Sequence, residues 1–224
     1  MYDLVGADDR RFSPFCWRIR MALAHKGLAV ETRPTRFTEI KDIPGGQGRV
    51  PVLVDGARIV PESWDIAEFL EATYPEAPSL FGGAAGRGLS RFVKNWVEAV
   101  LQPAIVTMVV ADVHARLTPE DLDYFRTSRE ARFGKPLDEV QAGREGRVEG
   151  LRQALLPLRL TLREQDFLGG DNPLFADHMV FGALQWPRVT SAFKLLEEDD
   201  PVAAWFERCL DLYGGIGRAM PAAA

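Results

Sequence analysis

The sequence predicts two domains, a mixed α/β domain over residues 1–80 followed by an all-helical domain over residues 89–224. Strand and hairpin signals occur only in the first part, and long helical patterns fill the second. Between them lies FGGAAGRG, residues 81–88, whose glycines and lack of large side chains after Phe81 are typical of a linker. With 224 residues and 46% hydrophobic content, the chain is long enough to bury a substantial core.

The first domain alternates strands and helices. A helix is predicted from Pro14 to about Lys26, because Gly27 can end it in a left-handed conformation. A second helix is expected to begin at Ser63, its N-cap, and to stop at Tyr74. The expected strands are residues 2–5, 28–33, 51–55 and 58–60, the last two forming a hairpin at Asp55-Gly56.

The second domain shows helical periodicity throughout. A capping hydroxyl at Thr118, a proline at the next position and an acid at Asp121 form a typical helix start. The expected helices cover residues 89–117, 119–132, 147–166, 176–187 and 201–213.

Composition excludes several classes of partner. The formal charge is −5, and no basic cluster interleaved with aromatics is present, so we expect no nucleic-acid binding. The apolar stretch 104–110 is much shorter than the roughly 20 residues that span a bilayer, so no membrane association is expected. Only Cys16 and Cys209 are present, which fits a reducing compartment. We therefore expect a soluble cytoplasmic protein.

Ser13 is the first candidate for a functional side chain. Pro14 favours the first helical position, so Ser13 is the expected N-cap. A helix N-terminus also favours a bound anion such as a thiolate, to which Ser13 could donate. A hydrolytic role is not expected, because His25 lies roughly 18 Å along the same helix and no Gly-x-Ser-x-Gly motif occurs. The three histidines lack metal-ligand spacing, so no metal site is predicted.

The stretch Ser13-Pro14-Phe15-Cys16 resembles the C-P-Y-C motif of glutaredoxins with the first cysteine replaced by serine. The resemblance implies a thioredoxin-like first domain. Dithiol exchange needs a thiolate at the first position, so the replacement implies a site that binds a thiol and does not supply one.

The whole N-terminal part is similar to glutathione transferases. Two motifs carry this resemblance: the segment at residues 49–51, which in the family ends in a cis-proline, and the acid–serine pair Glu62-Ser63. The resemblance implies glutathione as cosubstrate, with catalysis by Ser13, which would orient the sulfur. The Val50 backbone, within the Arg49-Val50-Pro51 segment, would pair with the cysteinyl unit. Ser63 and the helix start would hold the γ-glutamyl carboxylate, and Glu62 its ammonium group. The remaining glutathione-binding candidates, for the glycyl carboxylate, are Arg36 and Lys41.

Within that family the chain is most similar to the serine-type bacterial β-etherase-like branch. The motifs that carry this resemblance are S-P-x-x-W-R, HKG, RVPVLVDG, SWDIAEFL, LDEVQAGRE and FLGGDNPLFAD. This resemblance implies the glutathione-transferase architecture, a homodimer and cleavage of lignin-type β-aryl ethers. The partner would be a hydrophobic or aromatic electrophile, with Phe12, Phe15 and Met108 as pocket candidates. For Met108 a place in the helical core is the favoured alternative. The family's helix-capping box usually has Ser, Thr or Asn three residues before an aspartate. Here Leu174 precedes Asp177, so the reciprocal side-chain bond is missing and only the Asp177 side chain can bond back to the start of the helix.

Two other functions remain open. One is a non-catalytic carrier of small aromatic ligands that uses the same cleft. The other is a glutathione-dependent isomerase for a maleyl-type diacid, which would need basic residues facing the diacid. Helical arginines such as Arg116 cannot be placed from the sequence.

Overall fold

The first domain is a four-stranded mixed sheet with helices against it, as predicted. The computed structural model describes residues 1–224. The strand order is β2-β1-β3-β4, with β1 parallel to β2 and the other pairs antiparallel. The strands are β1 (Tyr2–Leu4), β2 (Arg33–Thr35), β3 (Val52–Asp55) and β4 (Arg58–Pro61).

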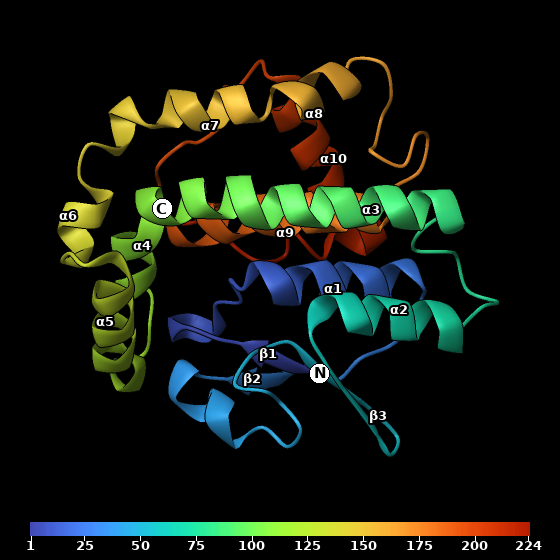
Figure 1. Ribbon diagram of the computed structural model, residues 1–224, viewed down its shortest axis with the longest axis horizontal. Coiled ribbons are helices and arrows are strands. Elements are labelled where there is room, and N and C mark those ends of the chain that lie inside the picture. The colour runs from blue at the N-terminus through green and yellow to red at the C-terminus, as the bar shows by residue number, and fades with distance from the viewer.

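Two helices separate this sheet from the second domain. Helices α1 (Pro14–His25) and α2 (Ser63–Thr73) lie between the strands and the long helices of the C-terminal domain (Figure 1). Helix α1 is followed by Gly27 at φ 67°, so the expected left-handed ending is confirmed. The short 3₁₀ segments η1 (Ala7–Asp9) and η2 (Phe37–Asp42) complete the domain.

Three predicted features of this domain, a strand, a hairpin loop and a helix N-cap, were placed at the wrong residues. The second strand is Arg33–Thr35 and not residues 28–33, because the register that pairs it with β1 begins at Tyr2 and Arg33. The hairpin loop is Gly56-Ala57, one residue later than expected, since Asp55 already pairs with Arg58. The N-cap of α2 is Glu62 and not Ser63, which is the first helical residue.

The second domain is helical throughout, as predicted. Its longer helices are α3 (Ala84–Trp96), α4 (Gln102–His114), α5 (Pro119–Phe133), α9 (Phe175–Thr190) and α10 (Pro201–Gly215). Its shorter segments are the π-helical η3 (Val97–Leu101), α6 (Leu137–Gln141), η4 (Arg144–Gly146), α7 (Val148–Ala154) and α8 (Leu156–Thr161).

The expected linker is partly helical. Helix α3 begins at Ala84, so residues 84–88 form its first turn instead of a flexible connector. A Cβ on Gly86 would lie 1.9 Å from the carbonyl oxygen of Phe81, so this glycine allows the chain to pack closely against the end of the first domain. The glycines therefore permit a tight turn here. From composition alone, the same glycine-rich stretch looks like a flexible linker.

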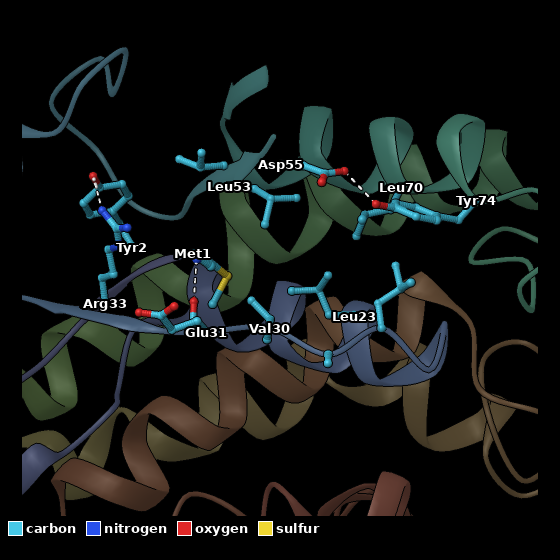
Figure 2. A pocket seen from close by; sticks show the side chains of 13 residues that line it. Met1, Tyr2, Leu23, Val30, Glu31, Arg33, Leu53, Asp55, Leu70 and Tyr74 are labelled. Carbon is cyan, nitrogen blue, oxygen red and sulfur yellow. Dashed lines mark hydrogen bonds between the residues drawn. The ribbon is translucent and has the colours of Figure 1, made fainter. Parts of the chain in front are cut away.

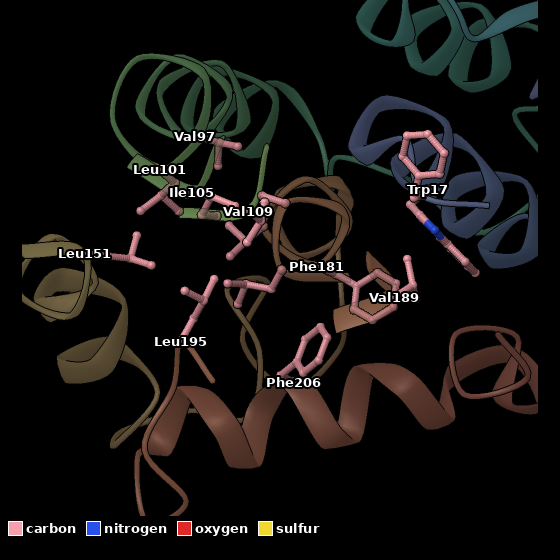
Figure 3. Packing of buried hydrophobic residues seen from close by; sticks show 14 of the residues in the cluster. Trp17, Val97, Leu101, Ile105, Val109, Leu151, Phe181, Val189, Leu195 and Phe206 are labelled. Atoms are coloured by element: carbon pink, nitrogen blue, oxygen red, sulfur yellow. The ribbon is translucent and has the colours of Figure 1, made fainter. Parts of the chain in front are cut away.

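Helices α3, η3 and α4 form one continuous helix. This helix, Ala84–His114, contains an 18-residue window with a mean hydropathy of 1.5, so by length and composition it could cross a membrane. The apolar window is longer than the stretch 104–110 recognised in the sequence. In this fold, its side chains Val97, Leu101, Ile105 and Val109 pack into the core (Figure 3). The apolar run is thus that of a central core helix.

The π-helical turn η3 has a local cause. Pro103 lacks an N–H, so the usual bond to the residue four earlier is not made there, while the N–H of Gln102 bonds to the carbonyl of Val97. The widened turn carries Glu98, whose side chain reaches the cavity described below.

Other helix boundaries also moved. The predicted helix over 147–166 is interrupted: α7 ends at Ala154 and α8 begins at Leu156, next to Pro157, which cannot donate a backbone bond. Helix α9 continues through Pro187 to Thr190. Residues 212–214 within α10 leave the helical conformation.

Helix α9 runs through the centre of the core. Phe181 from this helix meets Trp17 of α1 edge to face at 6.0 Å and packs on Phe206 of α10 (Figure 3). At its start, Asp177 accepts from the N–H of Leu174 at 3.0 Å and from Trp205 Nε1 at 3.0 Å. The expectation that Asp177 alone reaches back is confirmed, because a leucine side chain has no acceptor.

Candidate functional site

A cavity of about 630 Å³ opens between the two domains. The first domain contributes the loop before α1, η2, the segment before β3 and the start of α2; the second contributes α3, η3, α4 and α5. The candidates that line it are Phe12, Ser13, Phe15, Arg49, Val50, Glu62 and Ser63. The cavity therefore gathers residues from three separate sequence motifs.

Ser13 lies at the wall of this cavity as the N-cap of α1. Its Oγ accepts a hydrogen bond from the backbone N–H of Cys16 at 3.2 Å, and the residue is 4% exposed. A serine hydroxyl that accepts this bond still has its own O–H to donate. Capping and donation to an anion are therefore compatible at Ser13.

The start of α1 is held firmly by its neighbours. A Cβ on Gly182 of α9 would lie 2.4 Å from the carbonyl oxygen of Pro14, so a glycine is required for this close approach. On the other side, Trp17 Nε1 donates to the carbonyl of Arg11 at 2.8 Å and fixes the preceding loop. The hydroxyl of Ser13 consequently sits on a rigid support.

Cys16 is not equipped to act as the nucleophile. Its thiol is 1% exposed, and burial, followed by the negative charge of Asp3, raises its pKa well above the ordinary value. A thiol that stays protonated is a weak nucleophile. The geometry agrees with a site that binds a thiol brought by another molecule.

The Val50–Pro51 peptide bond is cis. Val50 lines the cavity, and none of the backbone hydrogen bonds outside the helices and strands involves it. Its N–H and C=O groups are thus available to a peptide bound in the extended conformation. This is the arrangement expected for Val50 and Pro51.

Glu62 and Ser63 begin α2 at the same cavity. Glu62 has a φ of 67°, a conformation that costs a non-glycine residue roughly 1–3 kcal/mol. Its carboxylate lies 3.4 Å from Arg49 Nη1, on an exposed pair. Strain of this kind is retained where the surrounding structure fixes it, and functional sites are a common place for it.

Two residues at this end were missed by the sequence reasoning. Arg18 is fully buried and donates from Nη1 to Glu98 at 2.9 Å and to Ser63 Oγ at 3.4 Å, while its Nε and Nη2 have no partner. Lys94 also pairs with Glu98. Arg18 stands in the S-P-x-x-W-R motif, which was a usable signal, but nothing local pointed to Glu98.

The opposite end of the cavity is aromatic. Phe12 lies 6.1 Å from Phe37, and Phe37 lies 5.3 Å from Phe125, between ring centroids. Tyr124 also lines this end, whereas Phe15 lines the cavity beside Arg18, whose guanidinium is 4.6 Å from the Phe15 ring centre. The sequence identified Phe12 and Phe15 but missed the other three, which come together only when α5 packs on η2.

Met108 does not belong to this wall. It is 1% exposed in the helical core and does not line the cavity. Two tryptophans nearby, Trp17 and Trp64, are buried, and Trp64 also borders the cavity.

The two candidates for the glycyl carboxylate lie outside the cavity lining. Arg36 donates to Glu39 at 2.9 Å through Nε and lies 3.4 Å from Glu120. Lys41 is exposed. Arg36 therefore already has two acidic neighbours.

One carboxylate joins the domains beside these residues. Asp121 of α5 is fully buried and accepts from the N–H groups of Phe37 and Thr38, at 2.8 and 2.9 Å, and from Thr38 Oγ at 2.9 Å. The sequence indicated Asp121 as part of its own helix start. It instead caps η2, across the domain boundary, and so holds Phe37 at the cavity.

A second cavity of about 230 Å³ lies elsewhere on the first domain and shares no lining residue with the first. Figure 2 shows its largely apolar wall, including Leu23, Leu53 and Leu70. Tyr74 donates to Asp55 at 2.6 Å at one side of it. None of the site candidates lines this cavity, and no group of three or more His, Cys, Asp or Glu side chains could hold a metal ion.

Comparison with curated proteins identifies relatives in several classes. A zeta-class glutathione S-transferase of Euphorbia esula is 30% identical over 115 residues, covering 47% of this chain and 49% of that protein. Glutathione S-transferase U2 of Arabidopsis thaliana is 25% identical over 176 residues, 77% and 65% of the two chains. A maleylacetoacetate isomerase of Dictyostelium discoideum is 30% identical over 99 residues, 39% and 43%. The chain thus spans about half to two thirds of the length of these relatives.

Solved structures match more of the chain. A glutathione transferase of Phanerochaete chrysosporium, GSTFuA3, superimposes with a TM-score of 0.76 at 27% identity, covering 97% of this chain and 92% of that one. A glutathione S-transferase of Ceriporiopsis subvermispora, CsGST63524, in complex with glutathione superimposes with a TM-score of 0.74 at 22% identity, covering 98% of this chain and 93% of that one, a likeness of fold.

Two family models cover most of the sequence in the expected order. The model for the N-terminal domain of glutathione S-transferases matches residues 9–78, and the model for their C-terminal domain matches residues 88–212. Both domains, the cis-proline segment and the cavity between the domains agree with these matches. The chain therefore belongs to the glutathione S-transferase family, whose cosubstrate is glutathione.

Proposed function

We propose that this protein is a serine-type glutathione transferase in which Ser13 activates the glutathione sulfur. The observation that carries the proposal is the Ser13 hydroxyl, fixed at the N-terminus of α1 on the wall of the cavity between the domains. A free thiol has a pKa of about 8.5, so little thiolate is present at neutral pH. The hydroxyl and the start of the helix would stabilise the anion and lower that pKa.

The remaining contacts to glutathione follow from the same wall. The Val50 backbone would pair with the cysteinyl unit, and Pro51 shapes that segment. Ser63 and the start of α2 would take the γ-glutamyl carboxylate, with the buried charge of Arg18 beside Ser63 adding to the attraction. Glu62 would take the ammonium group. The glycyl carboxylate would reach toward η2, where Arg36 and Lys41 are the proposed partners.

For the electrophile we propose an aromatic molecule, with β-aryl ether cleavage as its reaction. The aromatic wall that includes Phe12, Phe37 and Phe125 favours stacking with a ring. In a β-aryl ether with an α-carbonyl group, the thiolate would attack the β carbon and form a C–S bond. The C–O bond would break, and the phenoxide would leave with the electron pair. The products are a glutathione thioether and a phenol, so lignin-derived aromatics are the proposed substrates.

The test is release of a fluorescent phenol from a β-aryl ether α-ketone, with and without reduced glutathione. We expect release only with glutathione, and a large loss of rate in Ser13→Ala. Phenol release that does not need glutathione, or a wild-type rate in Ser13→Ala, would contradict the role of Ser13. A shift of melting temperature on adding glutathione measures binding separately from turnover.

The two alternatives make different predictions. A carrier of aromatic ligands would bind them equally well after Ser13→Ala and would release no product. A maleyl-type isomerase would regenerate free glutathione and convert a diacid without net consumption of thiol. The second alternative is supported by Arg129 and Arg132 of α5, which line the cavity, and by the partial similarity to a maleylacetoacetate isomerase.

We also propose a homodimer. Leu89 and Phe92 on α3 are 69% and 70% exposed, one helical turn apart, and form an apolar surface suited to a second copy of the chain. Sedimentation should show a dimer in the wild type and a monomer in Phe92→Glu. A cytoplasmic location is proposed from the two free, buried cysteines.

A further inference from the structure

Helix α5 presents two arginines to the cavity. Arg129 and Arg132, one turn apart on the same face of the helix, both belong to the cavity lining. Neither has a role in the glutathione contacts proposed above. Both lie at the aromatic end of the cavity, with Phe37, Tyr124 and Phe125.

These two guanidinium groups have no acidic partner. Arg129 donates only to Ser128 Oγ, at 2.9 Å, and Arg132 makes no side-chain hydrogen bond or ion pair. By contrast, Arg126 on the same helix, which does not line the cavity, pairs with Glu130 at 3.1 Å. Arg129 is half-buried and Arg132 is exposed at the mouth of the cavity. A half-buried arginine without a counter-ion, as at Arg129, is costly to keep unless something binds to it.

Aromatic rings hold Arg129 in place. Its guanidinium lies 4.6 Å from the ring centre of Phe125 and 5.1 Å from that of Phe37. This stacking leaves the edge of the guanidinium, with its N–H groups, free to donate in its plane. Burial lowers the pKa of Arg129, with a further contribution from the charge of Arg132, yet the group stays charged at neutral pH.

The acidic residues of the cavity are already paired. Glu98 binds Arg18 and Lys94, and Glu62 lies beside Arg49. The aromatic end therefore carries a local excess of positive charge from Arg129 and Arg132, within apolar walls that strengthen electrostatic attraction.

We propose that the electrophile of this enzyme carries a carboxylate group, which Arg129 and Arg132 bind while its ring stacks near Phe37. The inference rests on the proposed transferase function and adds the chemical class of its second substrate. Arginine suits this role because its planar N–H groups match the two oxygens of a carboxylate. The reactive carbon of the same molecule would then face the glutathione sulfur at Ser13.

A pair of matched probes tests the charge separately from the ring. One is chlorodinitrobenzoate, an activated aryl chloride with a carboxylate, and the other is its neutral amide. In each, the glutathione sulfur attacks the carbon that bears chlorine. The C–S bond forms, the C–Cl bond breaks, and chloride leaves with the electron pair, while the thiol proton goes to solvent. We expect a clear preference for the carboxylate in kcat/KM.

The variants are Arg129→Gln and Arg132→Gln, with Arg126→Gln as the matched control on the same helix. The preference, the ratio of kcat/KM for the carboxylate to that for the amide, should fall about tenfold in each cavity variant, mainly through KM for the carboxylate probe. It should also fall as salt concentration rises. Arg126→Gln should keep the wild-type preference.

Two results would overturn the inference. Equal losses for both probes would show that the arginines support structure only. A rise of KM for glutathione with an unchanged preference would show that they hold the glycyl carboxylate of glutathione instead.

Binding separates this inference from the proposed function. If neither aryl chloride is consumed, the transferase proposal fails, and calorimetry with unreactive dinitrobenzoate and dinitrobenzamide still tests the arginines. Tighter binding of the benzoate that is lost in Arg129→Gln supports the anion site. Equal binding of the two compounds overturns it.

Discussion

The two walls of the cavity are built in different ways. The wall from the first domain comes mainly from short stretches at residues 12–15, 48–50 and 62–64, with Phe37 and Ile40 of η2. The three stretches present backbone groups, helix starts and the hydroxyls of Ser13 and Ser63. The wall from the second domain comes from single side chains spaced along α3, η3, α4 and α5, with Trp186 from α9. The first wall suits a constant peptide-like ligand, whereas the second depends on which side chains the helices bring forward.

This difference indicates where specificity resides. Backbone groups and helix ends recognise a ligand regardless of most side chains, so the first wall is insensitive to many substitutions. On the second wall a single substitution can change charge or shape, because each side chain acts alone. Variants in the stretches around Ser13, Val50 and Ser63 should therefore alter reaction with every electrophile. Variants of the second wall, or of the first-domain aromatics Phe12 and Phe37, should discriminate among electrophiles.

The largest expected effect concerns Ser13, the side chain of the first wall for which we propose a role in the reaction. Ser13→Ala should lower kcat/KM about 100-fold for every electrophile, because removing one donor to a developing or stabilised anion typically costs that much. The apparent pKa of bound glutathione, read from the pH dependence of thiolate absorbance, should rise in the same variant. Ser13→Thr, which keeps the hydroxyl, should retain most of the shift. A loss restricted to one electrophile would contradict the proposal that Ser13 acts on the glutathione sulfur.

The second prediction concerns the link between the walls. Asp121→Ala removes a buried acceptor for three donors from Phe37 and Thr38, so the free energy of unfolding should fall by about 3 kcal/mol. Because Phe37 then loses its support, KM for an aromatic electrophile should rise more than KM for glutathione. Denaturant titration and steady-state kinetics measure the two effects. Asp123→Ala, exposed on the same helix, is the control, and equal changes in both KM values would argue against a local role.

The third prediction concerns a buried contact between the domains away from the cavity. Tyr213 Oη lies 2.8 Å from His25 Nδ1 of α1 and 3.0 Å from His178 Nε2 of α9. Burial, and secondly the charge of His25, lowers the pKa of His178 well below its ordinary value of 6.5; burial also lowers the pKa of His25. Both rings therefore resist protonation in the folded state.

The sign of the pH effect follows from these lowered values. Above 6.5 both folded and unfolded chains hold the imidazoles neutral, and stability is retained. As the pH falls through 6.5 toward the folded pKa, the unfolded chain binds protons and stability is lost. His178→Gln should flatten the dependence of melting temperature between about pH 7 and 5. An unchanged slope would contradict the assignment.

The smallest effect separates stability from binding on the first wall. Glu62→Gly should raise the free energy of unfolding by up to about 1 kcal/mol, because glycine adopts the observed positive φ without strain. It should also weaken glutathione binding, since the carboxylate is lost. Glu62→Ala loses the carboxylate and keeps the strain, so it should bind as weakly without becoming more stable. Thermal unfolding and glutathione titration test the pair, and unchanged glutathione affinity would contradict a role for Glu62.

Much of the first wall could be predicted because its signals are local. A serine before a proline at a helix start, a Val-Pro pair before a strand and an acid–serine pair before a helix each fix the nearby backbone. The errors there were small shifts of strand and cap, as at Arg33 and Glu62, where sheet register and tertiary packing override local propensity.

The second wall could not be predicted in the same way. Helical periodicity identified α5 but not the direction in which Arg129 and Arg132 point, because an arginine on a solvated face and one in a cavity look alike in sequence. Asp121 illustrates the point, since its sequence context indicated a helix cap, and in the structure it binds η2 of the other domain.

The amino-acid sequence was sufficient to predict the order of the two domains, the helix with Ser13 at its N-terminus and the motifs that form the first wall. The packing of the helices was needed to learn which side chains of α3, η3, α4 and α5 complete the cavity and that Arg129 and Arg132 lack acidic partners. The physical reason is range: caps, turns and periodicity act within a few residues, whereas contacts such as Arg129 with Phe37 depend on how distant helices pack.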